Sequence, residues 1–429
     1  MEKIDATQVL LTGGEILDLQ TQRVTRADVV IVAGKIAKIG QEDRASFSGQ
    51  VRDISGHVLV PGLIDMHVHL REPGREDEET IESGCAAAMA GGFTALCCMP
   101  NTDPVCDKQE VVRFIKKRGE ETLVDVFPIA AITKKQEGKE LTEMADLVRA
   151  GAVAFSDDGK PVQNAVVMRH ALEYASMYDV PIIDHCEDDD LSANGQIHEG
   201  RMSTRLGLAG IPDISEEIMI SRDISLAEYT GGRIHIAHIS TQKGVECVRR
   251  AKEAGVQVTC EVTPHHLAFT DERLATFDTN YKMRPPLRSR QDVEALIRAV
   301  KEGVIDAFAS DHAPHAIEEK EVEFSAAANG ILGLQTMVSV LISKLVQPGH
   351  LTLAEVLAKM VIAPRKILRI PIPKIQEGEF ANMTILQPDQ TWTMEPGLNR
   401  SRSRNSPYFG LTLPGVLWGV CNKGQLWIA

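Results

Sequence analysis

Eight short apolar segments recur along the middle of the chain, and helical patterns separate most of them. We predict strands at 63–68, 93–99, 124–129, 152–155, 181–183, 234–237, 256–262 and 305–309. Helical patterns lie between them at 80–90, 165–178, 216–229, 244–254 and 292–301. Strands that are apolar on both faces are typical of a parallel sheet covered by helices. Eight such units predict an α/β fold, most simply a closed barrel.

The two ends of the chain have a different pattern. Residues 1–60 and 371–429 contain short alternating strands and turn residues, and the first of these segments has no helix period. We expect the two ends to pair into one small composite β domain. Residues 61–370 then form the barrel domain, with additional helices at 334–345 and 353–367.

Composition excludes several classes of partner. The 429-residue chain is 43% hydrophobic and 25% charged, which is typical of a globular protein. Its formal net charge of −14 argues against a nucleic-acid or anionic-membrane surface. No GxGxxG follows a strand and no GxxxxGK[ST] is present, so the sequence gives little support to a dinucleotide or nucleotide site.

The N-terminus and the cysteines predict the cellular compartment. The first residues have no basic segment followed by an apolar core, and no run of about 18 apolar residues follows. The eight cysteines are scattered without CxxC pairs, several of them in apolar segments. We expect reduced, buried thiols in a cytoplasmic protein.

Chemically active side chains follow the predicted strands. They are His67 and His69, Asn101, the pair Asp157 and Asp158, His185, His238, Asp311 and His315. In a barrel of this type the carboxyl ends of the strands meet at one face, so these side chains are expected to converge. His67 and His69 are two apart on one strand and would project to the same side.

The chemistry of this set favours two metal ions. Even four of its imidazoles with two carboxylates exceed the three protein ligands of an ordinary catalytic zinc, and a carboxylate can bridge two ions. Nitrogen and oxygen ligands without thiolate suit an open zinc pair. Asp311 is the best-placed proton acceptor, and Arg71 provides a cationic fork for a carboxylate.

At these residues the sequence resembles the bacterial type I dihydroorotases of the amidohydrolase superfamily. The resemblance extends over nearly the whole chain and includes HVHLREPG from His67, MPNT from Met99, SDDG, HCED, HIST, EVTPHH, PPLR and SDHAPH. HxHLREPG together with DHAPH is specific, whereas HxH alone marks the superfamily.

The resemblance implies a TIM-type barrel with a composite β-sandwich domain and reversible cyclisation of N-carbamoyl-L-aspartate to L-dihydroorotate in pyrimidine synthesis. It implies two Zn²⁺ ions, with His67 and His69 on one, His185 and His238 on the other, Asp158 as the bridge and Asp311 as ligand and general acid/base. It also implies that Arg71, Asn101 and His315 bind the substrate carboxylate, beside His69. Lys160 lies past its strand end after a glycine, so we expect it to be solvated rather than a carboxylated bridge.

The sequence departs from the family pattern at two places. Arg284 stands where asparagine commonly precedes PPLR, and Ala328-Asn329-Gly330 stands where Pro-Phe-Gly is usual. Both places line the substrate ring in relatives, so Arg284, Asn329 and Gly330 are candidate substrate-binding residues. For Arg284 a surface-loop role stays open. His265 and His266 are expected to have supporting roles, because the ligand set is already full.

Two other functions stay open from the sequence. A related cyclic amidohydrolase acting on hydantoins or allantoin would use the same metal ligands, although a neutral ring needs no Arg71. An inactive homologue could instead scaffold aspartate carbamoyltransferase, although no ligand is missing here. The sequence also leaves open whether the chain forms a homodimer.

Overall fold

The computed structural model describes residues 2–429. An eight-stranded parallel sheet forms the centre of the molecule, in the order β16-β15-β14-β11-β10-β9-β8-β7. Its strands are β7 (Leu63–Val68), β8 (Phe93–Cys98), β9 (Asp125–Ala130), β10 (Ala154–Ser156), β11 (Ile182–Asp184), β14 (Ile234–Ile236), β15 (Val258–Val262) and β16 (Ala307–Phe308). Every strand predicted from the apolar segments is present at its expected place.

Helices connect successive strands and cover the outside of this sheet. They are α1 (Ile81–Gly91), α2 (Gln109–Glu120), α3 (Met144–Ala150), α4 (Ala165–Ser176), α7 (Ile214–Thr230), α8 (Gln242–Glu253), α10 (Arg290–Lys301) and α13 (Leu353–Leu368). Side-chain caps begin several of them. The Thr241 hydroxyl accepts from the Gly244 amide at the start of α8, and Ser289 does the same for Asp292 at α10.

The sheet closes into a barrel at the carboxyl ends of its two outer strands. Val68 at the end of β7 pairs in parallel with His312, which follows β16. The His69 amide donates to the His312 carbonyl at 2.9 Å. This closure brings the segment after β7 directly beside the segment after β16.

Hydrophobic side chains fill both sides of the barrel wall. On the outside, Leu63 and Leu96 of the strands share a buried cluster with Val112, Val248 and Leu296 of the helices. A second buried cluster joins strand residues from around the barrel, Ile64, Cys97, Ile129, Ile183 and Ala307 among them, and so fills its interior. The two clusters hold the strand ends at fixed places.

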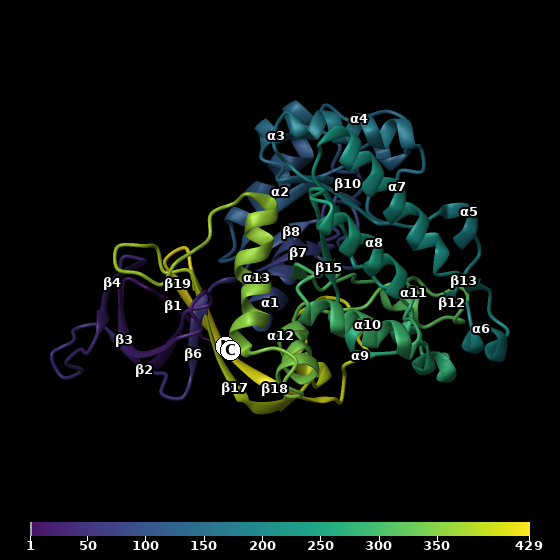
Figure 1. The fold of residues 1–429 in the computed structure, drawn as a ribbon. Coiled ribbons are helices and arrows are strands. Elements are labelled where there is room, and N and C mark those ends of the chain that lie inside the picture. Colours follow the sequence, from purple (N-terminus) through teal and green to yellow (C-terminus); the bar gives the residue numbers. More distant parts are fainter. Residues whose placement is uncertain (1) are drawn as a thin grey trace.

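The two ends of the chain form one nine-stranded sheet beside the barrel. It contains β1 (Glu2–Asp5), β2 (Gln8–Leu17), β3 (Val24–Val32), β4 (Lys35–Gly40), β5 (Gln50–Asp53), β6 (Val58–Pro61), β17 (Met383–Thr393), β18 (Thr412–Asn422) and β19 (Gln425–Ile428). In Figure 1 the purple N-terminal strands and the yellow C-terminal strands lie together on one side of the barrel. The fold is therefore a TIM-type (β/α)8 barrel with a composite β domain.

Several elements were not expected from the sequence. Between β11 and α7 the chain forms α5 (Asp189–Ser192), β12 (Ile197–His198), α6 (Arg201–Leu206) and β13 (Gly210–Ile211). Further unexpected short helices are α9 (Pro264–Ala268) and α11 (Ile317–Lys320). The helix predicted at 334–345 is present as α12 (Met337–Leu341), continued by a π-helix at Ile342–Val346. Short 3₁₀ turns lie at Lys134–Gln136, Asp271–Thr276, Thr279–Tyr281 and Pro396–Leu398. In the C-terminal segment, where short strands were expected, β17 is a single long strand that pairs with β18 with two register shifts.

Candidate active site

Two histidines and one carboxylate meet where β7 ends. His67 is the second-last residue of β7 and His69 follows the strand. The Nε2 atoms of these residues lie 3.3 Å and 3.4 Å from the two carboxylate oxygens of Asp158. Asp158 therefore presents one oxygen to each histidine. With both histidines, Asp158 can thus contribute a ligand atom to one cation.

The other ligand candidates surround the same carboxylate. Nε2 of His238 lies 3.3 Å and Nδ1 of His185 3.7 Å from Asp158 Oδ1. Asp311, after β16, places Oδ1 at 3.0 Å from His69 Nε2 and 3.6 Å from His67 Nε2. The structure thus brings together all six residues that the sequence suggested as metal ligands.

These side chains form three overlapping groups with the geometry of metal sites. The groups are His67, His69 and Asp158; His67, His238 and Asp311; and Asp158, His185 and His238, and within each group the ligand atoms lie within 4.8 Å of one another. All six residues are buried. The Nε2 atom of His67 is buried without a hydrogen-bond partner. A buried nitrogen that faces two carboxylates in this way fits a cation.

The electrostatics of the cluster also favour a cation. Burial alone would raise the pKa of Asp158, but the charge of His67 and hydrogen bonds from His185 and His238 outweigh it and hold the pKa well below its usual range. Burial would lower the pKa of His185, but Asp158 and Glu187 outweigh it and raise the pKa to about 10. The carboxylates are therefore ionised and draw positive charge into the site.

Hydrogen bonds behind the ligands fix the orientation of their rings. His69 Nδ1 donates to Asn101 Oδ1 at 2.8 Å, and His67 Nδ1 donates to Glu261 Oε1 at 2.8 Å. Asp157 accepts from the amides of Ile132 and Thr133, and so anchors the loop that carries Asp158. These contacts leave Nε2 of both histidines directed at the centre.

Arg71 is buried next to this cluster of metal-ligand candidates. Its guanidinium Nε donates to the Pro314 carbonyl at 3.0 Å and lies 2.9 Å from Glu78 Oε2, while Nη2 lies 3.4 Å from His315 Nε2. His315 Nε2 is also 2.9 Å from the Asn329 carbonyl. The structure therefore gathers Arg71, His315 and Asn329, three of the predicted substrate-binding residues, at one place.

Gly330 has no room for a side chain. A Cβ atom there would lie 2.5 Å from His315 Cδ2 and 2.6 Å from the Ala313 carbonyl oxygen. The glycine lets the two backbone segments approach closely. It thereby holds the His315 ring between Gly330 and Arg71.

Arg284 occupies a different part of the site. Its Nε donates to Glu187 Oε1 at 2.7 Å and its Nη2 to Ser192 Oγ at 2.9 Å. Glu187 Oε2 lies 3.8 Å from Nε2 of His185. The arginine side chain is 33% exposed, so it lies at the rim and reaches the metal cluster through Glu187.

The neighbouring polar residues fall outside the three ligand groups at the centre. Lys160 is exposed, as expected for a solvated side chain. His266 hydrogen-bonds to Thr263 Oγ1 and to the Pro285 carbonyl. His265 is buried with neither ring nitrogen hydrogen-bonded, and burial lowers its pKa to about 4.

Sequence reasoning missed three carboxylates. Glu261 supports His67, Glu187 joins Arg284 to His185, and Glu78 contacts Arg71. The sequence did contain a signal for Glu261, because it is a charged residue within an apolar barrel strand. Burying a carboxylate costs its hydration free energy, so such a residue is expected to pair with a polar partner. The other two lie in loops and have no comparable local pattern.

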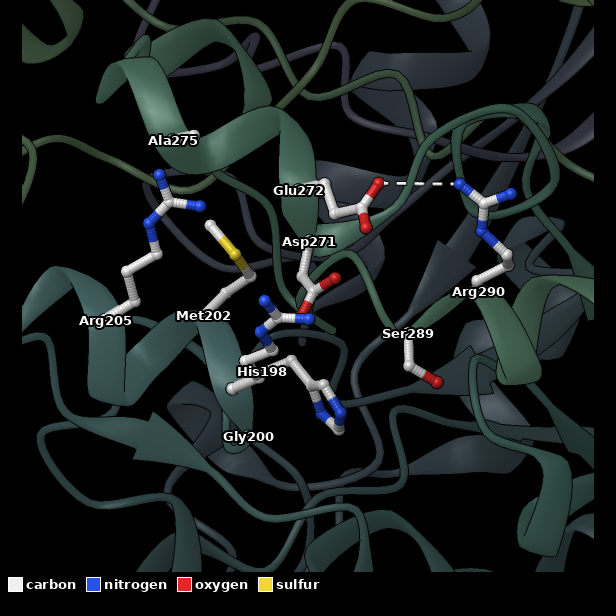
Figure 2. Close-up of a pocket in the computed structure, with 10 residues that line it drawn as sticks. His198, Gly200, Met202, Arg205, Asp271, Glu272, Ala275, Ser289 and Arg290 are labelled. Atoms are coloured by element: carbon white, nitrogen blue, oxygen red, sulfur yellow. Dashed lines mark ion pairs between the residues drawn. The ribbon is translucent and has the colours of Figure 1, made fainter.

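A separate cavity lies away from these residues. It has a volume of about 480 Å³ and is lined by His198, Arg205, Asp271 and Arg290 among others. Figure 2 shows the arginines around its opening, with Arg290 paired to Glu272. None of the predicted site residues lines it.

Among residues 2–429, none of the helices combines the length and apolar character that crossing a bilayer requires. All eight cysteines are free, and seven of them are buried. The expectation of reduced, buried thiols is confirmed for seven of the eight, because Cys247 is only half-buried.

Comparison with known proteins agrees with this geometry. Residues 56–244 match the family model described as "Dihydro-orotase-like". The chain is 48% identical over 421 residues to "Dihydroorotase" of Syntrophus aciditrophicus (strain SB), covering 98% of this chain and 99% of that protein. It is also 48% identical to "Dihydroorotase" of Pelotomaculum thermopropionicum, with 98% of each chain covered.

Solved structures share the fold at lower identity. The L-hydantoinase (dihydropyrimidinase) of Arthrobacter aurescens superposes with a TM-score of 0.86 at 24% identity and covers 98% of this chain and 96% of that one. A D-hydantoinase gives a TM-score of 0.83 at 22% identity, with 98% and 95% covered. The near-full-length identity to curated relatives decides the family: the chain belongs to the dihydroorotases.

Proposed function

We propose that this chain catalyses the reversible cyclisation of N-carbamoyl-L-aspartate to L-dihydroorotate. One observation carries the proposal: the buried Arg71 lies beside a cluster of six metal-ligand candidates. A substrate with two carboxylates can place one on the metal ions and the other on the arginine. Near-full-length identity to curated dihydroorotases supports the same reaction.

We further propose that two Zn²⁺ ions bind in the cluster. His67 and His69 would hold one, His185 and His238 the other, with Asp158 between them and Asp311 completing the set. When bound, the metal ions supply Lewis acidity toward the reacting carboxylate and lower the pKa of water. The donor set fits them, because it offers imidazole nitrogens and ionised carboxylates without a thiolate.

Arg71 anchors the carboxylate that does not react. Since its Nε contacts Pro314 and Glu78 and its Nη2 lies 3.4 Å from His315 Nε2, its Nη1 is left for a ligand. Asn101 uses its oxygen on His69 and so retains its Nδ2 group as a donor. His315 lies against Arg71 and completes the set of carboxylate contacts. Fixing one end of a small substrate aligns its reacting atoms.

Asp311 moves the proton during ring closure. It lies 3.0 Å from His69 Nε2 within the cluster, beside the place where the ring would form. The ureido nitrogen forms a C–N bond to the side-chain carboxyl carbon while Asp311 accepts the N–H proton. The departing carboxyl oxygen leaves as water with that proton and one from solvent. Ring opening follows the reverse path.

The remaining substrate contacts that we propose lie at the rim. The Asn329–Gly330 backbone lies next to His315 and would contact the substrate ring. Arg284 would face the ring from the opposite segment, held by Glu187 and Ser192. Its charge suits an anionic substrate. All of these residues belong to a single chain.

We place the reaction in pyrimidine synthesis in the cytoplasm. The eight free thiols support a reducing compartment.

Substrate comparison tests the proposal. The purified protein should turn over dihydroorotate and carbamoyl aspartate, and turn over hydantoin and allantoin at least about 100-fold more slowly, because neither neutral ring engages Arg71. Turnover of hydantoin or allantoin with negligible turnover of dihydroorotate would assign the chain to the other cyclic amidohydrolases. Failure to turn over any of the four compounds after zinc loading would support an inactive scaffold.

A further inference from the structure

A segment from the β domain extends onto the mouth of the barrel. Residues 399–409, here called the strap, connect the 3₁₀ turn at Pro396–Leu398 to β18 and contain no helix or strand. In Figure 1 this is the yellow segment that runs from β17 toward the helices of the barrel before it returns to β18. The Ser403 hydroxyl donates to the Glu78 carbonyl at 2.6 Å, and the Arg402 amide donates to Glu79 at 2.9 Å.

One side chain of the strap reaches both backbone segments of the proposed carboxylate site. Asn405 Nδ2 donates to the Ala313 carbonyl at 2.9 Å and to the Gly330 carbonyl at 3.0 Å. Its Oδ1 accepts from the His315 amide at 3.2 Å. The Leu332 amide donates to the Asn405 carbonyl at 3.0 Å. The residue is 2% exposed, so these contacts are shielded from water.

The two segments that Asn405 joins meet the substrate from different parts of the chain. One is 313–315, after β16, and the other is 329–331, after α11. They also contact each other directly: the Ala313 amide donates to the Ile331 carbonyl at 3.0 Å, and His315 Nε2 lies 2.9 Å from the Asn329 carbonyl. The His315 ring is in contact with Gly330 and Arg71, so its position depends on the distance between the two segments.

Only a carboxamide can make this set of contacts. It offers two N–H donors to the two carbonyls and one oxygen to the amide. Aspartate would keep the acceptor but lose both donors and place a charge against two carbonyl oxygens. Alanine would leave the Ala313 carbonyl and the His315 amide without partners, and the Gly330 carbonyl with Lys320 alone.

We infer that Asn405 is a positioning residue for the substrate: by tying Ala313, His315 and Gly330 together, it sets the geometry of the site that receives the non-reacting carboxylate. This inference rests on the proposed function. Asn405 does not touch the metal cluster residues, so it acts on substrate binding rather than on metal content or the proton transfer.

The chain offers a matched control. Asn422 is also a buried asparagine that ties backbone segments together, since its Nδ2 donates to the Leu123 carbonyl at 3.0 Å and to the Thr94 carbonyl at 3.4 Å. These contacts lie at the amino end of the barrel strands, away from the proposed site. A purely structural effect of losing a buried amide should appear equally in both variants.

Steady-state kinetics of Asn405→Ala and Asn422→Ala test the inference, with metal content and melting temperature measured for each. For Asn405→Ala we expect KM for both substrates to rise about tenfold or more and kcat to fall by less than about threefold, as for the loss of binding contacts. For Asn422→Ala we expect a similar loss of melting temperature with KM changed by less than about twofold. Metal content should stay at the wild-type value in both.

Two variants that conserve side-chain shape test the inference if Asn405→Ala does not fold. Asn405→Asp should raise KM further, while Asn399→Asp should leave it unchanged, because Asn399 donates only to Ser401 and Ser403 within the strap. An unchanged KM in a folded Asn405 variant overturns the inference but leaves the proposed function standing. A KM change in Asn422→Ala as large as that in Asn405→Ala has the same consequence. A wild-type chain that turns over neither substrate overturns the proposed function, and the inference with it.

Discussion

Glu261 of β15 accepts a hydrogen bond from Nδ1 of His67 of β7 at 2.8 Å, across the place where the barrel closes between β16 and β7. The same carboxylate lies 3.3 Å from Nε2 of His235. Burial would raise the pKa of Glu261, but its hydrogen bonds to His235 and His67 lower it to about 2. An ionised carboxylate at this place keeps the proton of His67 on Nδ1 and leaves Nε2 free to bind a metal ion.

Glu261→Gln should weaken metal binding. Loss of the carboxylate lets the His67 ring change its tautomer and orientation, and the expected fall in metal affinity is about 10- to 100-fold. Competition against a chromogenic chelator measures it. Glu72→Gln is the control, because Glu72 is a buried carboxylate that contacts the Ile81 amide and Arg118 instead of a histidine ligand. Equal metal affinity in the wild type and Glu261→Gln would contradict this role.

Arg71→Met should weaken substrate binding. Removal of a buried cationic partner of a carboxylate costs about 2–5 kcal/mol, so kcat/KM should fall at least about 30-fold, chiefly through KM. Arg75→Met is the comparison, since Arg75 contacts the same Glu78 but its side chain is 38% exposed. Its effect on KM should be less than about threefold. If the two variants lose activity equally, Arg71 does not bind the substrate.

Asp311→Asn should slow the reaction itself. Without a proton acceptor beside the ureido nitrogen, kcat should fall about 10²- to 10⁴-fold, and KM should change much less. Steady-state rates in both directions, with metal content determined on the same samples, provide the measurement. A normal kcat with a raised KM would assign Asp311 to substrate binding instead.

Lys320 makes stability depend on pH. Its ammonium group is buried and donates to the carbonyls of Ala328 and Gly330, and burial lowers its pKa from 10.5 to about 7. The unfolded chain keeps this proton up to pH near 10.5, so between the two values the unfolded state binds more protons than the folded state. The free energy of unfolding therefore rises with pH in this window.

From pH 7 to pH 9 the contribution of Lys320 to the free energy of unfolding should increase by about 2 kcal/mol. Denaturant unfolding of the wild type and of Lys320→Met at both pH values isolates the contribution of Lys320. The variant should lack this increase in the free energy of unfolding. Lys301→Met, at an exposed position, should behave as the wild type does. An identical pH increment in Lys320→Met would show that Lys320 does not titrate in this range.

The features that the sequence predicted are those with a local pattern. The barrel strands are continuous apolar segments, and the ligand candidates stand at their carboxyl ends, so the closure of the barrel was enough to bring His67, Asp158 and Asp311 together. The composite β domain was likewise predictable from the alternating strand patterns at both ends of the chain. For the barrel and its site, short-range hydrophobic periodicity defines the strands, and the rule that their carboxyl ends meet at one face defines the arrangement of the ligand candidates.

The features that were missed depend on contacts between distant segments. Asn405 lies 75 residues from Gly330 in the chain, and no pattern in the strap indicates that its amide reaches the barrel. Arg284 was expected at the substrate ring, yet which acidic residue it pairs with depends on how the loops after β11 and β15 fold together. Such pairings follow from three-dimensional packing and leave no periodic signal in the sequence.

Metal content per chain, measured together with turnover of carbamoyl aspartate, tests the central claim most directly. The account predicts two zinc ions per chain, loss of activity when a chelator removes them, and recovery when zinc is restored. Protein that binds no stoichiometric metal and still cyclises carbamoyl aspartate, or that binds two zinc ions and turns over neither carbamoyl aspartate nor dihydroorotate, would contradict it.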